Sequence, residues 1–113
     1  MKRLLFALAP VLVLAPTAAE ARPARCVVAS AGSPTWRGAC DFRAEAGGSF
    51  SISPARGSFP GGIDPISVFM IRPGVADVRG LTRDGINSRW GEARRSRRDP
   101  ACWVGEDFSI CAY

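Results

Sequence analysis

Residues 26–42, CVVASAGSPTWRGACDF, decide the fold class. Two short β-prone segments, 26–30 and 37–42, flank a stretch whose glycine and proline are turn formers. This order predicts a β-hairpin. Each arm of the hairpin carries one cysteine, so a disulfide between Cys26 and Cys40 is the preferred local pairing.

The following residues continue this pattern of short strands separated by Gly, Pro, Ser and Asp. Residues 47–53, GGSFSIS, alternate Phe50 and Ile52 with serines, which predicts a half-buried strand. Residues 66–72, ISVFMIR, are almost continuously apolar, which predicts a central strand covered on both faces. Between them, residues 54–65 contain several prolines and glycines and form either a functional loop or an ordered surface excursion.

A second hairpin is predicted over residues 75–93, where VADVRGL and NSRWGEA flank TRDGI. A type I turn followed by Gly85 in the left-handed conformation pairs Thr82 with Ile86. A two-residue loop would instead place two carboxylates, Asp77 and Glu92, opposite each other, so we prefer the first register. The preferred register opposes Val78 to Trp90, Val75 to Ala93 and Asp77 to Gly91.

A third hairpin is predicted at the C-terminus, in residues 102–113, CWVGEDFSICAY. A turn at 105–108 places Cys102 directly opposite Cys111, so this pairing is also local. Each local disulfide would close a loop of roughly ten to fifteen residues and contribute about 2 to 3 kcal/mol to stability. Four cysteines allow three pairings, however, and bonds that cross between the first and last hairpins stay open as the alternative.

These segments predict one small all-β domain, residues 26–113, that is stapled by two disulfides. Its strands, roughly six to eight, would form an antiparallel sheet, a sandwich or a barrel. No stretch has convincing helical periodicity.

The N-terminus has the three parts of a secretory signal peptide. A basic start is followed by an apolar stretch of roughly a dozen residues, shorter than a membrane span, and by the small-residue exit AEA at 19–21. We predict cleavage after Ala21, a short disordered lead over 22–25, a periplasmic or secreted protein, and no transmembrane segment after cleavage. Loss of residues 1–21 would change the net charge from +5 to +4, with every remaining positive side chain an arginine.

The composition excludes several classes of enzyme. The chain has no histidine, which is the commonest general base and zinc ligand. No lysine follows the predicted signal peptide, so a Ser-Lys dyad and a Schiff base are excluded as well. Oxidised cysteines provide no thiolate for attack or for metal binding. We therefore predict no enzymatic activity, no catalytic or metal-binding residues and no cofactor.

An arginine-rich segment, residues 89–103, RWGEARRSRRDPACW, is the best candidate for a binding site. Arg94, Arg95, Arg97 and Arg98 are expected to lie in the connection between two strands, where their side chains can converge on one anionic target. Nearby indole rings could add contacts to a sugar, a phosphate or an acidic surface. The alternative is a solvated loop whose tryptophans belong to the core. The candidate ligand-binding residues are Arg94, Arg95, Arg97, Arg98, Trp90 and Trp103.

The last quarter of the chain, GINSRWGEARRSRRDPACWVGEDFSICAY, contains Trp-Gly, Arg-Ser and Cys-Trp pairs. In this pattern it resembles small, uncharacterised exported bacterial proteins. The resemblance implies no particular activity, so no site residue is taken from it.

A net positive charge suits an anionic partner. We predict a non-enzymatic protein of the bacterial envelope that binds an anionic polymer or a protein surface through its arginine-rich loop. Two alternatives stay open: a secreted inhibitor that inserts residues 54–62 or the arginine loop into an enzyme's cleft, and a structural accessory subunit of a larger assembly. We do not expect nucleic acid as a ligand, because an exported protein rarely meets it. The sequence leaves the oligomeric state open.

Overall fold

The computed structural model describes Pro10 and residues 21–113. The predicted signal peptide, residues 1–21, therefore lies outside the described residues except at Pro10 and Ala21. Among the described residues, no helix has the length and apolar character needed to cross a membrane. This part of the chain forms one short 3-10 helix, Ala46–Gly48, and the strands β1 (Ala21–Ser30), β2 (Trp36–Ala44), β3 (Phe50–Pro54), β4 (Ile66–Arg72), β5 (Val75–Leu81), β6 (Asn87–Arg95), β7 (Cys102–Val104) and β8 (Phe108–Ala112).

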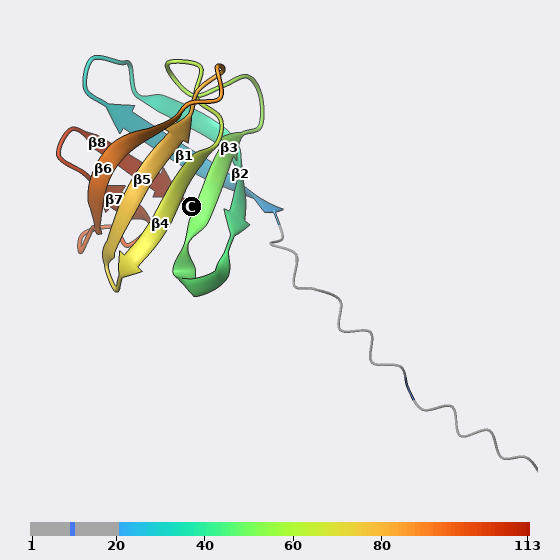
Figure 1. Cartoon of the computed structure of the whole chain (residues 1–113), viewed down its shortest axis with the longest axis vertical. Helices are drawn as coiled ribbons and strands as arrows, with labels where there is room; N and C mark the ends of the chain where they lie inside the picture. The colour runs from blue at the N-terminus through green and yellow to red at the C-terminus, as the bar shows by residue number, and fades with distance from the viewer. Residues whose placement is uncertain (1–9, 11–20) are drawn as a thin grey trace, which may run out of the picture.

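Each strand pairs antiparallel with the next, and β8 pairs with β1, so the sheet closes into a barrel (Figure 1). This architecture confirms the predicted all-β class. Because neighbours in sequence are also neighbours in the sheet, the connections alternate between the two ends of the barrel. One end carries the connections 31–35, 55–65, 82–86 and 105–107. The other end carries 45–49, 73–74, 96–101, the start of β1 and the end of β8.

The barrel is filled by the side chains that alternate inward along its strands. Phe50 and Ile52 of β3 are buried, as the alternation predicts, and they pair with Val68 and Ile66 of β4. None of the described polar or charged residues is fully buried. The interior is therefore an apolar core, to which every strand contributes at least one residue.

Both preferred disulfides are confirmed. Cys26 is bonded to Cys40 across β1 and β2, with their Cα atoms 5.8 Å apart. Cys102 lies directly opposite Cys111 and is bonded to it across β7 and β8. Each bond joins the two arms of one hairpin, so the crossed pairings do not occur. Cys26 and Cys40 are each only 1% exposed, which makes the first bond part of the core.

The predicted disordered lead, residues 22–25, is wrong, because β1 begins at Ala21. The main chain here pairs with β2, and that pairing does not require buried side chains. Pro23 is tolerated because β8 runs beside β1 only from Cys26 to Ser30. Pro23 therefore lies where β1 has a strand on one side only, the position in which a missing N–H costs least.

The prediction that residues 66–72 are covered on both faces is also wrong. Phe69 is 40% exposed and Ile71 is 53% exposed. A barrel wall has one inner face, and the outer face of β4 carries these two side chains because no second layer packs on it. The apolar run therefore describes a wall strand with an apolar outer face.

The second hairpin has the predicted turn and a register that changes along its length. The Thr82 N–H donates to the Ile86 carbonyl at 2.8 Å, and Gly85 has φ +80°, as predicted. A bulge at Trp90 then shifts the pairing by one residue, so that Asp77 lies opposite Glu92 instead of Gly91. The shift is accommodated by a φ of +121° at the glycine after Trp90, a value that favours glycine.

The facing carboxylates are tolerated because arginines surround them. Arg89 Nε donates to Asp77 Oδ1 at 2.8 Å, and Arg79 Nε donates to Asp77 Oδ2 at 3.1 Å. Arg72 lies 3.9 Å from the Glu92 carboxylate. Positive charge from these arginines therefore offsets the repulsion between Asp77 and Glu92. The sequence alone favours the unshifted register because the rule for cross-strand pairs considers only the two residues that face each other.

Residues 54–65 plug one end of the barrel. Phe59 and Ile63 form a β-bridge within this loop and are 1% and 7% exposed. The Phe59 ring packs edge-on against the Trp36 ring, with centroids 4.9 Å apart. The loop is thus a surface excursion that returns two apolar side chains to the core, and we call this end of the barrel the plugged end.

One aromatic ring closes a gap in the wall between β6 and β8. β7 pairs with β6 only at Arg94 and Arg95, so the wall beyond Val104 has no strand there. The Phe108 ring fills this space and is 6% exposed. A Cβ at Gly105 would lie 2.1 Å from this ring. The ring therefore occupies the space that a side chain at position 105 would need.

We expect each disulfide to be a major source of stability. Replacing Cys26 and Cys40 together by alanine should lower the free energy of unfolding by about 3 kcal/mol, and replacing Cys102 and Cys111 by slightly less, because the first bond closes the longer loop. Urea denaturation measures both. A loss below about 1 kcal/mol for either pair would contradict the role assigned to it.

Gly105→Ala should destabilise the protein by about 1 to 3 kcal/mol, because the new methyl group overlaps the Phe108 ring. The double variant Gly105→Ala with Phe108→Leu should lose less than the sum of the two single variants, since leucine removes the overlapping ring atoms. Thermal unfolding of the four proteins checks this. Strict additivity would show that the ring and position 105 do not compete for space.

Candidate functional site

The predicted arginine site is only partly a loop. Arg94 and Arg95 are the last residues of β6, whereas the prediction placed them in the connection between strands. Successive strand residues point to opposite faces, so these two side chains do not converge. Arg97 and Arg98 do lie in the connection 96–101 and are exposed.

The structure separates the two predicted tryptophans. Trp103 on β7 is 4% exposed and lies beside Arg95, at the end of the barrel where β1 begins and β8 ends. Trp90 lies at the bulge of β6, where its ring packs edge-on against Phe108 with centroids 5.7 Å apart. Trp90 therefore supports the wall and does not share a site with Trp103.

Arg95 faces the inner side of the barrel at its end. It lies two residues beyond the buried Ala93 on the same face of β6. Its guanidinium carbon is 5.9 Å from the centroid of the Trp103 ring, within reach of a cation–π interaction. Its Nε donates to the Pro100 carbonyl at 2.8 Å. Arg95 is thus held in place, and its two terminal nitrogens remain for other partners.

Arg22 is a second inward-facing arginine, and the sequence analysis missed it. It shares a face of β1 with Ala24 and Cys26, and its guanidinium carbon lies 4.4 Å from the centroid of the Phe42 ring. Alternation along β1 could have found it, because residues 22, 24, 26 and 28 share one face of a strand, and Cys26 and Val28 of this set are buried. The assignment of 22–25 to a disordered lead hid that signal.

These two arginines border a hollow of about 260 Å³ at the end of the barrel. A second hollow, of about 460 Å³, adjoins it and shares Met70, Arg95 and Trp103. Of the residues that the structure describes, none that lines either hollow is acidic. The first hollow is lined by Arg22, Phe42, Gly48, Phe50, Met70, Arg95, Pro100, Ala101, Trp103 and Ala112.

Positive charge gathers at this end, which we call the arginine end. Three carboxylates lie there too: Glu45, which is exposed, Glu92 close to Arg72, and Asp99, which accepts hydrogen bonds from the Tyr113 hydroxyl and the main-chain N–H of residue 101. The connections at the plugged end contain four carboxylates and two arginines, whereas those at the arginine end contain two of each, and the excess of arginine there comes from the ends of strands. The arginine end contains Arg22, Arg43, Arg72, Arg94, Arg95, Arg97 and Arg98. The plugged end contains Arg56, Arg83, Asp64, Asp84, Glu106 and Asp107.

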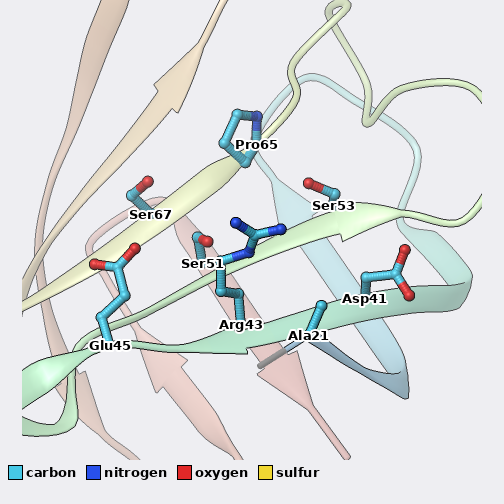
Figure 2. Close-up of a pocket in the computed structure, with 8 residues that line it drawn as sticks. All are labelled: Ala21, Asp41, Arg43, Glu45, Ser51, Ser53, Pro65 and Ser67. Atoms are coloured by element: carbon cyan, nitrogen blue, oxygen red, sulfur yellow. The ribbon is translucent and has the colours of Figure 1, made fainter. Parts of the chain in front are cut away.

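A further hollow lies on the outer wall of β2, β3 and β4, and Figure 2 shows its lining. Arg43 lies between Asp41 and Glu45 along β2, with three serines facing it from the next two strands. The charges here alternate in sign, and the serines leave no apolar floor. This wall is a solvated polar surface and does not concentrate charge of one sign.

The described residues contain no free cysteine and no cluster of His, Cys, Asp or Glu placed to hold a metal ion. Comparison of the chain with protein-family models, with curated proteins and with solved structures found no match. The site is therefore interpreted from its own residues.

Tyr113, the one tyrosine of the chain, reports on the arginine end. Its hydroxyl donates to Asp99, and this hydrogen bond, together with the negative charge of Asp99, raises the pKa of Tyr113 above 10.0. We expect the tyrosinate absorbance to titrate above that value, and Asp99→Asn to lower the midpoint. The folded state holds the proton more tightly, so this contribution to stability is present below about pH 10 and is lost as the pH rises through the folded-state pKa.

The matched control is Glu106→Gln, at the plugged end, which should leave the titration midpoint unchanged. If Asp99→Asn has no more effect than this control, the interaction between Tyr113 and Asp99 does not hold in solution.

Proposed function

We propose that this protein is an exported, non-enzymatic binding module that takes up an anionic component of the cell envelope at its arginine end. The observation that carries the proposal is the pair of guanidinium groups at inward-facing positions of the barrel end, where they border a hollow whose described lining contains no acidic residue. Both arginines are exposed at the end of the barrel, so their guanidinium groups are accessible to an anion from solution.

The surrounding contacts support binding of an anion. The described residues place Arg95, Arg97 and Arg98 in no ion pair, so these groups are not neutralised from within. The nearest carboxylate in sequence, Asp99, accepts its hydrogen bonds from Tyr113 and the main chain. The exposed loop arginines can attract a polyanion over a distance, and the inward pair can form direct hydrogen bonds to it.

Two properties of the chain support export and a non-enzymatic role. Disulfides persist in oxidising compartments, and all four cysteines are paired. The chain has no histidine, and its only lysine is Lys2. For the alternative of an enzyme inhibitor, residues 54–62 are a poor plug for a partner's cleft, because Phe59 of this loop is already buried in the core.

Binding to dextran sulfate, with uncharged dextran as the matched ligand, tests the proposal. We expect dextran sulfate to bind, uncharged dextran not to bind, and the affinity to fall steeply with added salt, because ion pairs with a polyanion release counterions. Replacing Arg97 and Arg98 by glutamate should weaken binding by at least about tenfold. Isothermal titration calorimetry at several salt concentrations measures this.

The control variant replaces Arg56 and Arg83, at the plugged end, by glutamate. It changes the net charge by the same amount and should bind nearly as well as the unmodified protein. Equal losses in the two variants would show that only the net charge matters, and the proposal of a site at the arginine end would then fail.

A further inference from the structure

We infer that the hollow at the arginine end binds an acyl chain that ends in a carboxylate, with the chain in the hollow and the carboxylate between Arg22 and Arg95. This inference rests on the proposed function, because it uses the same end of the barrel and names the chemical class of its ligand. The ligand is also expected to have an apolar part, because the floor of the hollow is apolar.

The two ends of the barrel differ in how their inner side chains are covered. At the plugged end, Phe59 and Ile63 return from the loop and are almost completely buried. At the arginine end, no loop of the described residues returns apolar side chains in this way, although Phe50 and Trp103 are buried there too. Phe42 and Met70, which line the hollow of about 260 Å³, are only partly buried, so a ligand in the hollow can cover them.

The floor of the hollow is apolar. The Phe42 and Phe50 rings stack with centroids 4.9 Å apart, and Trp103 and Met70 line the same space. Small residues keep the space open: Gly48 has no side chain and a φ of +86°, which favours glycine. Several methylene groups fit such a volume, and each one removed from water contributes about 0.8 kcal/mol.

The rim of the hollow selects the head group. A carboxylate has about four acceptor sites on two oxygens, and two guanidinium edges can supply that number of N–H donors. Arg95 already uses Nε for the Pro100 carbonyl, which leaves its two terminal nitrogens to donate. A phosphate monoester would bring a third oxygen, whose acceptor sites two guanidinium edges would leave without a donor. A neutral head group would leave the arginines unsatisfied.

Met70 gives a direct readout, because the chain has only two methionines, Met1 and Met70, and Met70 lines both hollows. The protein is labelled with ¹³C at the methionine methyl groups, and the Met70 signal is assigned with Met70→Leu. Octanoate is the probe. Acetate has the same head group without the chain, octanol has the chain without the charge, and octyl phosphate has the other anionic head group.

We expect octanoate to shift the Met70 methyl signal in a saturable way and acetate to leave it unchanged. Octanol and octyl phosphate should bind more weakly than octanoate, octanol by about tenfold or more, because it lacks the charge-assisted hydrogen bonds. Octanol binding as well as octanoate would overturn the role of the two arginines. Octyl phosphate binding more tightly would overturn the assignment of a carboxylate.

Two sets of variants test the two parts of the site. Arg22→Gln with Arg95→Gln should weaken octanoate binding by about tenfold or more, whereas Arg97→Gln with Arg98→Gln should leave it nearly unchanged. Ala101→Leu extends a side chain from the lining of the hollow and should abolish octanoate binding while dextran sulfate still binds. Thermal unfolding of each variant shows that it is folded.

The outcomes for the two ligands are separable. If dextran sulfate binds through Arg97 and Arg98 but octanoate does not shift the Met70 signal, the proposed function stands and the acyl-chain inference is overturned. If octanoate binds equally well when Arg22 and Arg95 are both glutamine, the carboxylate does not lie between them, and the inference is likewise overturned.

Discussion

The pairing of β1 with β8 is the interaction on which the rest of the structure depends. It joins the first and last strands of the chain, and without it the eight strands would form an open sheet with two exposed edges. Closure gives the sheet an inner face that is covered on all sides by its own wall. Cys26 lies at this seam: it is opposite Ala112 of β8 and is bonded to Cys40 of β2. The core disulfide thus fixes the strand that closes the barrel.

Closure leaves two ends, and the chain treats them differently. One end receives Phe59 and Ile63 from a long loop, while the other retains a hollow bordered by Arg22 and Arg95. Carboxylates outnumber arginines in the connections at the plugged end, whereas at the other end the strand ends of β1, β2, β4 and β6 add an excess of arginine. The two ends of the barrel therefore differ in both packing and charge. This difference underlies the proposed binding of an anion and the further inference of an acyl chain.

An arginine can occupy an inward position at a barrel end because its side chain has two parts. The methylene stem and the flat face of the guanidinium pack on aromatic rings, and the edge of the guanidinium stays accessible to polar partners. The guanidinium carbon of Arg22 lies 4.4 Å from the centroid of the Phe42 ring, and that of Arg95 lies 5.9 Å from the centroid of the Trp103 ring. Such contacts restrict the donors before a ligand arrives, which reduces the conformational entropy lost on binding.

The sequence by itself determined the local features. The three hairpins, the left-handed Gly85 and both disulfides follow from turn residues and from cysteines close together in the chain, so no distant contact was needed to predict them. It also supplied Arg95 and Trp103 of the candidate site. Contacts between distant segments decided the rest. The seam of β1 and β8, the plug made by Phe59, the bulge at Trp90 and the placement of Arg22 and Arg95 at one hollow all depend on which strands meet when the barrel closes. A one-residue shift in register changes the face on which a side chain lies.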